Sequence, residues 1–166
     1  MSNYIIRRYQ PGDEVGIAEA HRESIRRIVA KDYAPQQIDV WAGRIAPEKY
    51  VDSMQTKGET FWVLDDNGTI GGFAGWVPGC MYGFYMHPDY AGKGLARRLF
   101  EAAEKDMMEH TPSNTCDIDA TITARPFYER MGFEVVEQAK HTFGNGTVID
   151  IFKMRKTYQP EPEQTK

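Results

Sequence analysis

The chain has 166 residues, a length that suits one domain with a buried core and is short for two. We expect a single domain over residues 1–158, followed by a flexible polar tail over residues 159–166. The 20 basic and 24 acidic side chains give a net charge of −4, which argues against nucleic acid as a partner. The first residues lack the apolar segment of a signal peptide, and no later apolar run approaches the length of a membrane span, so we expect a cytoplasmic protein without a membrane partner.

The residue types that bind metals are few and scattered. The two cysteines, Cys80 and Cys116, lack CxxC spacing, and we expect both to be reduced thiols. The four histidines lie far apart in the sequence and show no spacing typical of metal ligands. We therefore expect no bound metal.

The first part of the chain predicts one strand and three helices. Residues 3–10 have strand composition, and a Pro-Gly turn with two acidic residues follows, which suits a helix start. Apolar residues then recur mostly at helical spacing over residues 15–29. A proline near the beginning of residues 32–43 and another near that of residues 46–56 predict two short helices.

The rest of the chain contains most of the predicted strands. Two aromatic and β-branched runs over residues 60–77 flank Asn67 and Gly68, a pattern typical of a hairpin. Hydrophobic periodicity and turn residues predict the other elements. These are a strand over 80–86, a helix over 95–107, a strand over 115–121, a short helix over 124–131 and a hairpin over 133–156. The order predicts an α/β fold with a mixed sheet and helices on both faces.

The segment from His87 to Gly94 leads from a strand directly into a helix. Such a turn presents backbone N–H groups at the positive end of the helix dipole, which suits a phosphate or pyrophosphate. Gly92 and Gly94 leave room for the anion and adopt positive φ without steric cost, while Lys93 adds charge. A tight turn without a ligand is the alternative. The segment matches neither the Walker A loop nor the GxGxxG fingerprint.

Two segments, "FYMHPDYAGKGLARRLF" and "IDATITARPFYERMGFEVV", resemble the two signature segments of the GNAT superfamily of N-acetyltransferases. The resemblance implies the GNAT fold, with a mostly antiparallel sheet of about seven strands that splays between the fourth and fifth strands. It also implies acetyl-CoA as the acyl donor without a metal, and a small-molecule or peptide amine as the acceptor. Homodimers are common in the family, so a homodimer is a further expectation.

The resemblance assigns roles to residues of both segments. The loop from Ala91 to Ala96 matches the segment whose amides hold the coenzyme A pyrophosphate, although Ala91 stands where the family has Arg or Gln. The strand before it matches the segment that pairs with the pantetheine arm. Tyr128 matches the tyrosine that protonates the departing thiolate. The implied cofactor-binding residues are Phe84, Tyr85, Met86, Ala91, Gly92, Lys93, Gly94, Leu95, Ala96, Arg97, Thr121 and Phe127.

The acceptor side has weaker signals. Residues 80–86 contain no Asp or Glu, although some relatives carry their general base there. The candidates elsewhere are His21, Glu23, Asp32, Tyr33 and Asp119. Trp41, Trp76 and Tyr82 are candidates for the wall of an acceptor pocket, with core packing as the alternative. The Met86 amide is the expected donor to the oxyanion.

These features predict an N-acetyltransferase in which a primary amine attacks the thioester of acetyl-CoA directly in a ternary complex. Cys80 and Cys116 match no nucleophile position, so we expect no acyl-enzyme. The alternative is a module that binds acetyl-CoA as a sensor and transfers nothing.

Overall fold

The computed structural model describes residues 3–159. The strands are β1 (Tyr4–Arg8), β2 (Thr60–Asp66), β3 (Thr69–Val77), β4 (Cys80–Met86), β5 (Thr115–Thr121), β6 (Glu134–Thr142) and β7 (Val148–Thr157). The helices are α1 (Asp13–Arg27), α2 (Pro35–Gly43), α3 (Pro47–Lys57), α4 (Leu95–His110) and α5 (Arg125–Arg130), with short 3-10 helices η1 (Val29–Asp32) and η2 (Pro88–Tyr90). Of the predicted tail, all but Gln159 lies outside the described residues.

The strands form a seven-stranded sheet in the order β1-β2-β3-β4-β5-β7-β6. All neighbouring strands are antiparallel except β4 and β5, which are parallel. The predicted mixed, mostly antiparallel sheet is therefore confirmed. Asn67 and Gly68 form the β2–β3 turn with positive φ angles of 51° and 93°, as the Asn-Gly pair predicts.

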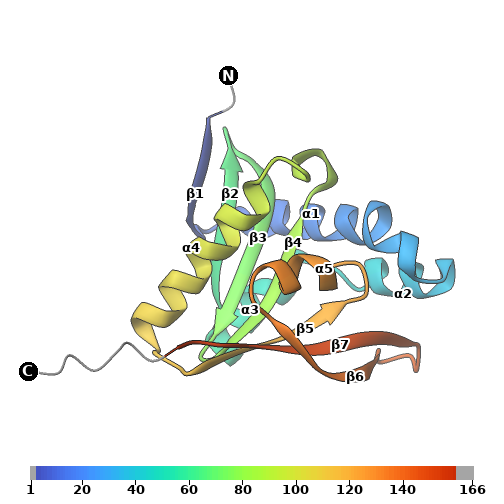
Figure 1. The fold of residues 1–166 in the computed structure, drawn as a ribbon. Helices are drawn as coiled ribbons and strands as arrows, with labels where there is room; N and C mark the ends of the chain where they lie inside the picture. The colour runs from blue at the N-terminus through green and yellow to red at the C-terminus, as the bar shows by residue number, and fades with distance from the viewer. Residues whose placement is uncertain (1–2, 160–166) are drawn as a thin grey trace, which may run out of the picture.

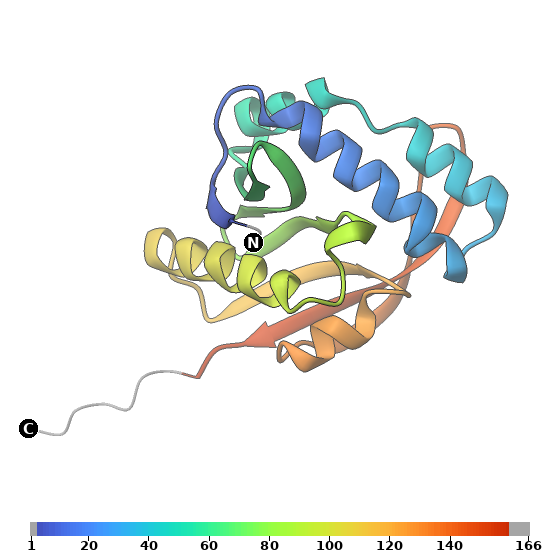
Figure 2. The ribbon, with the colours of Figure 1, turned by 90° about the horizontal axis from the view of Figure 1, so that it is seen from above.

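Helices cover both faces of the sheet. Figure 2 shows α1, α2 and α3 on one side, and α4 and α5 on the other. In α4, Leu95, Leu99, Ala103 and Met107 recur every four residues and are buried against the strands. The opposite face has two apolar clusters that pack beneath α1, α2 and α3.

The sheet opens between β4 and β5. The two strands pair only at Cys80 and Asp117, and then diverge, as the different directions of β2–β4 and β5–β7 in Figure 1 show. From Tyr82 to Met86, the edge of β4 that faces β5 has no strand partner among the described residues. The splay predicted between the fourth and fifth strands is confirmed, and it exposes backbone hydrogen-bonding groups inside the molecule.

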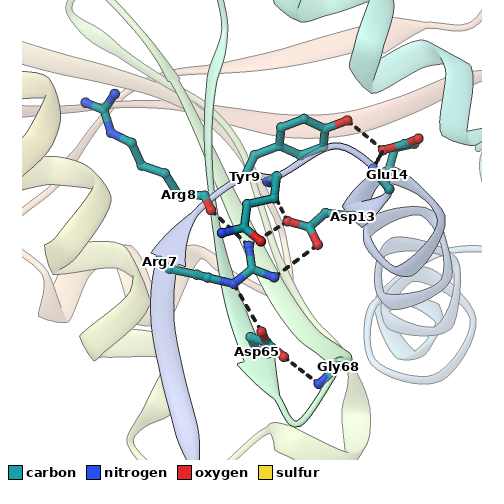
Figure 3. Close-up of polar contacts among 9 residues, drawn as sticks. Arg7, Arg8, Tyr9, Asp13, Glu14, Asp65 and Gly68 are labelled. Atoms are coloured by element: carbon teal, nitrogen blue, oxygen red, sulfur yellow. Dashed lines mark hydrogen bonds and ion pairs between the residues drawn. The ribbon is translucent and has the colours of Figure 1, made fainter.

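Ion pairs fix the start of α1 against the β2–β3 hairpin. Figure 3 shows the Arg7 guanidinium between Asp13 of α1, at 2.8 Å, and Asp65 of β2, at 3.1 Å. Asp65 also accepts the Gly68 N–H of the hairpin turn at 2.7 Å. One arginine of the edge strand thus connects a helix, a strand and a turn.

No helix within residues 3–159 is long and apolar enough to cross a membrane.

Candidate functional site

The glycine loop has the geometry of an anion site. Gly92 and Gly94 have φ angles of 75° and 74°, which a residue with a side chain rarely adopts. A Cβ built on either glycine meets no atom within 4 Å, so the space beside the loop is open. Gly94 precedes α4, and among the described residues no side chain caps the N–H groups of the first turn. Backbone donors and the helix dipole therefore favour a phosphate here.

The charged side chains around the loop contribute less than the sequence suggests. Arg97 is exposed and bonds Glu101 at 2.8 Å, within its own helix. The Lys93 ammonium lies 5.8 Å from the centre of the Tyr90 ring. The side chain of Leu95 is buried in the core, so only its backbone is available to a ligand. Affinity for an anion depends mainly on the loop's main chain.

A groove of about 320 Å³ lies in the splay between β4 and β5. Eight of the residues predicted for the cofactor or for catalysis line it. They are Phe84, Tyr85, Met86, Ala91, Ala96, Thr121, Phe127 and Tyr128. The structure thus brings most of the residues from both signature segments to one cavity. Gly92, Lys93, Gly94, Leu95 and Arg97 are not among its lining residues and belong to the adjoining loop and helix start.

Tyr128 has a buried ring and a hydroxyl without a partner. The ring is 3% exposed and packs edge-on against Phe133 at 5.8 Å. Within residues 3–159 its hydroxyl makes no hydrogen bond, and the side chain lines the groove. Burial raises the pKa of this phenol well above 10, with smaller effects of Tyr85 and Cys116. It therefore holds its proton at neutral pH and can donate it into the groove.

Thr121 and Phe127 have structural contacts of their own. The Thr121 hydroxyl accepts the Ala124 N–H at 3.0 Å, and this bond helps to begin α5. Its own proton stays available for a ligand. Phe127 stacks on Phe84, with ring centres 5.4 Å apart and an angle of 13°, and this contact joins the two walls of the groove.

A second hollow, of about 340 Å³, adjoins the groove on the face that carries α1 and α2. The two cavities share the lining residues Tyr82, Tyr85, Ile118, Asp119 and Thr121. The second hollow also has aromatic walls, from Trp41, His141 and Phe143. A molecule in this hollow can therefore approach one in the groove.

The residues predicted for the acceptor side lie in different places in the structure. Trp41, Tyr82 and Asp119 line the second hollow. Trp76 does not, and its assignment to an acceptor pocket is wrong, because its indole N–H donates to Asp106 on the α4 side at 3.1 Å. The Tyr33 hydroxyl accepts the Ile122 N–H and donates to the carbonyl of residue 150, so both of its hydrogen-bonding functions are in use.

The other three candidates on the N-terminal helices also have structural partners. Glu23 pairs with Arg27 in α1, and Asp32 accepts a bond from the Thr123 hydroxyl. His21 is outside the lining of both cavities, and its Nδ1 lies 2.8 Å from the Tyr50 hydroxyl.

Glu59 is a buried carboxyl group that the sequence reading missed. It is 6% exposed, and its Oε1 accepts the Ser53 hydroxyl at 2.7 Å. Burial raises the pKa of this carboxyl to about 7, against smaller opposing effects of Ser53 and Lys57. The one signal in the sequence is a charged residue placed directly before an apolar strand.

The chain belongs to the GNAT family of acetyltransferases. The family model described as "Acetyltransferase (GNAT) domain" matches residues 29–158. The splayed sheet, the glycine loop at the start of α4 and the groove are the structural counterparts of this match, and the chain is an acetyltransferase. Within the described residues no group of three or more side chains could hold a metal ion.

The chain is also similar to individual proteins that are named as N-acetyltransferases. The chain is 31% identical to the uncharacterized N-acetyltransferase YafP of Escherichia coli K12, over 97% of this chain and 99% of the relative. A GCN5-related N-acetyltransferase from Rhodopseudomonas palustris has a similar structure, with a TM-score of 0.84, 26% identity and coverage of 95% and 98%. The PaiA N-acetyltransferase of Thermoplasma acidophilum, solved with coenzyme A, has a TM-score of 0.73 at 22% identity, with coverage of 94% and 99%.

Proposed function

We propose that this protein transfers the acetyl group of acetyl-CoA to a primary amine, which attacks the thioester directly while both substrates are bound. The observation that carries the proposal is the unpaired edge of β4 inside a groove that ends at a glycine loop. Coenzyme A has a pyrophosphate for such a loop and amides in its pantetheine arm for such an edge. The structure of PaiA with coenzyme A is in keeping with this donor.

The proposed positions of the donor follow from the groove. The pyrophosphate lies on the amides of Gly92 and Gly94, and the pantetheine arm runs along Phe84, Tyr85 and Met86 as an added strand. The Thr121 hydroxyl donates to an amide of the arm. Ala91 provides no charge, so the backbone supplies most of the affinity for the phosphates.

The proposed chemistry uses Tyr128 as the acid. The amine nitrogen forms a bond to the thioester carbon, and the oxyanion accepts the backbone N–H of Met86. The carbon–sulfur bond then breaks, and the thiolate takes the Tyr128 proton. The nitrogen then loses its extra proton, which restores the Tyr128 phenol through water, and the amide and the free thiol are the products.

No thiol takes part in this scheme. Burial raises the pKa of the Cys116 thiol to about 12 and that of Cys80 to about 11, so neither is a thiolate at neutral pH. Cys80 lines the second hollow. We expect mass spectra recorded during turnover to show no acetylated enzyme, in the wild type or in Cys80→Ala.

Calorimetric titration with acetyl-CoA tests the donor, with free coenzyme A as the comparison. We expect micromolar binding of both, because they share the pyrophosphate and the pantetheine arm. A panel of alkyl and aryl amines, assayed for thiol release and for acetylated product by mass spectrometry, then tests the transfer. Undetectable binding of both ligands would contradict the donor site. Binding without transfer to any amine would favour the sensor.

A further inference from the structure

A carboxylate at the position of Glu59 does little to stabilise the fold. It directly follows Gly58, the C-terminal cap of α3, so its charge faces the negative end of a helix dipole. Burial adds a further cost. Ser53 donates the one hydrogen bond that the carboxyl group receives from the described side chains. Folding alone therefore gives little reason for a carboxyl group here.

Two glycines make room for the Glu59 carboxyl group. Gly75 of β3 and Gly83 of β4 lie opposite each other in the sheet. A Cβ built on Gly75 would lie 1.9 Å from Glu59 Oε2 and 2.7 Å from the Phe61 ring, so no side chain fits there. A Cβ on Gly83 would lie 3.8 Å from the same oxygen. The Oε2 atom thus lies against the backbone of Gly75 and Gly83, where no side chain intervenes.

This pair of glycines adjoins the groove. Gly83 lines the groove, and its neighbours Tyr82 and Tyr85 line both cavities. Next to Gly83 the strand bulges, because Gly75 pairs with Gly83 and Trp76 with Met81, which leaves Tyr82 unpaired. Glu59 is itself outside the lining of both cavities and lies behind the segment of β4 where they meet, so a proton from a bound amine reaches it through a bridging water molecule.

We propose that Glu59 is the general base that accepts the proton of the acceptor amine, in place of the carboxylate that β4 lacks. This inference rests on the proposed transfer to an amine. Ser53 holds Oε1, and Oε2 is the oxygen without a hydrogen-bond donor among the described residues.

The proton balance of the step is simple. The ammonium of the acceptor loses one proton to Oε2 through one water molecule, and the freed amine attacks the thioester carbon. After the carbon–sulfur bond breaks, Tyr128 supplies the proton of the thiol. The second proton leaves the nitrogen as the amide forms and restores the Tyr128 phenol, directly or through water. The carboxylic acid of Glu59 then releases its proton to solvent.

The surroundings of Glu59 suit a base that works near neutral pH. Its pKa of about 7 makes it a carboxylate for part of the time and a stronger acceptor than an exposed glutamate. The titratable groups that act on it or respond to it are Lys57, Tyr50 and Cys80. Lys57 is exposed and also bonds the Tyr82 hydroxyl, while burial keeps Tyr50 and Cys80 neutral.

The test compares Glu59→Gln with Glu48→Gln, an exposed glutamate of α3. For a primary alkyl amine, we expect Glu59→Gln to lower kcat/KM by about 10²- to 10³-fold and to leave the dissociation constant of acetyl-CoA within about twofold. The rise of wild-type kcat/KM with pH near 7 should disappear in this variant. Glu48→Gln should match the wild type in both respects.

An aryl amine separates a base from a structural residue. Such an amine is already neutral at pH 7 and needs no base. In Glu59→Gln, the factor by which kcat/KM falls should therefore be at least about tenfold smaller for the aryl amine than for the alkyl amine. Equal losses for both amines, or an unchanged pH profile, would overturn the assignment of Glu59 and leave the transferase intact. A wild-type enzyme that transfers acetyl to no amine would overturn the proposed function and this inference together.

Discussion

Tyr128 combines a buried ring with a hydroxyl that lacks a partner in the described part of the chain. If it protonates the thiolate, Tyr128→Phe should lower kcat by about 10²- to 10³-fold, while the dissociation constant of acetyl-CoA stays within about twofold. Tyr158→Phe is a matched control, because that hydroxyl bonds Glu104 at the α4 side. Steady-state kinetics and calorimetry measure the two effects. Unchanged turnover would remove Tyr128 from the mechanism.

His21 and Glu59 should change the free energy of unfolding with pH in opposite directions. Burial lowers the pKa of His21 to about 3, with a smaller effect of the Arg22 charge, so below pH 6.5 the unfolded state binds the extra proton. Acid therefore destabilises the fold through His21. The native state holds a proton on Glu59 between pH 4.5 and about 7, so stability from this group falls as the pH rises.

Single variants should reveal each dependence. The wild type should lose about 1–2 kcal/mol relative to His21→Phe when the pH falls from 6.5 to 5. Relative to Glu59→Gln, it should gain stability over the same change. Urea unfolding at several pH values measures both differences, and the other histidines cancel because both proteins of each pair contain them. Differences that do not vary with pH would contradict the burial of these two groups.

At the scale of the element, Asp106 fixes α4 to the sheet. Its carboxylate accepts the indole N–H groups of Trp62 at 2.8 Å and Trp76 at 3.1 Å, and it pairs with Arg8 of β1. Burial alone would raise its pKa, but these donors outweigh burial and hold the pKa below 3.8. One side chain therefore connects α4 with three strands.

Removal of this carboxylate should be costly. Asp106→Ala leaves two indole N–H groups and a guanidinium without their acceptor, and we expect a loss of about 3 kcal/mol in the free energy of unfolding. Glu109→Ala, an exposed change on the same helix, should cost less than about 0.5 kcal/mol. Denaturant unfolding at pH 7 measures both. A loss for Asp106→Ala as small as that of Glu109→Ala would contradict its structural role.

The elements could largely be predicted from the sequence, because their signals are local. The Asn-Gly turn, the proline at each helix start and the apolar stripe of α4 act within a few residues, and both signature segments are contiguous. The position of Trp76 depends on packing between distant elements: side chains alternate along β3, and Trp76 shares with Ala74 the face that α4 covers. Glu59 was missed for a similar reason: its site needs two glycines from other strands, and only strand register brings them together.

At the scale of the molecule, the sheet consists of two parts that pair at one position. β1–β4 and β5–β7 meet in the ladder only at Cys80 and Asp117. Two apolar clusters also connect the parts. On the α4 side, one cluster contains Met81 of β4 and Ile118 of β5. On the other side, Ile25 and Val29 belong to a cluster with Ile149 and Ile151 of β7. Along the rest of β4, the groove separates the two parts. The expected homodimer stays a prediction, with the edge strand β6 of the C-terminal hairpin as the candidate contact.

A donor that lies along β4 should therefore stabilise the whole fold. At a concentration 100 times its dissociation constant, acetyl-CoA should add about 2.7 kcal/mol, which raises Tm by about 5–10 °C. Hydrogen exchange should slow most in residues 82–86, because the pantetheine arm takes the place of a strand at this edge. Adenosine diphosphate, which has the pyrophosphate without the arm, should protect the glycine loop alone. Equal protection of residues 82–86 by both ligands would show that the arm does not pair with β4.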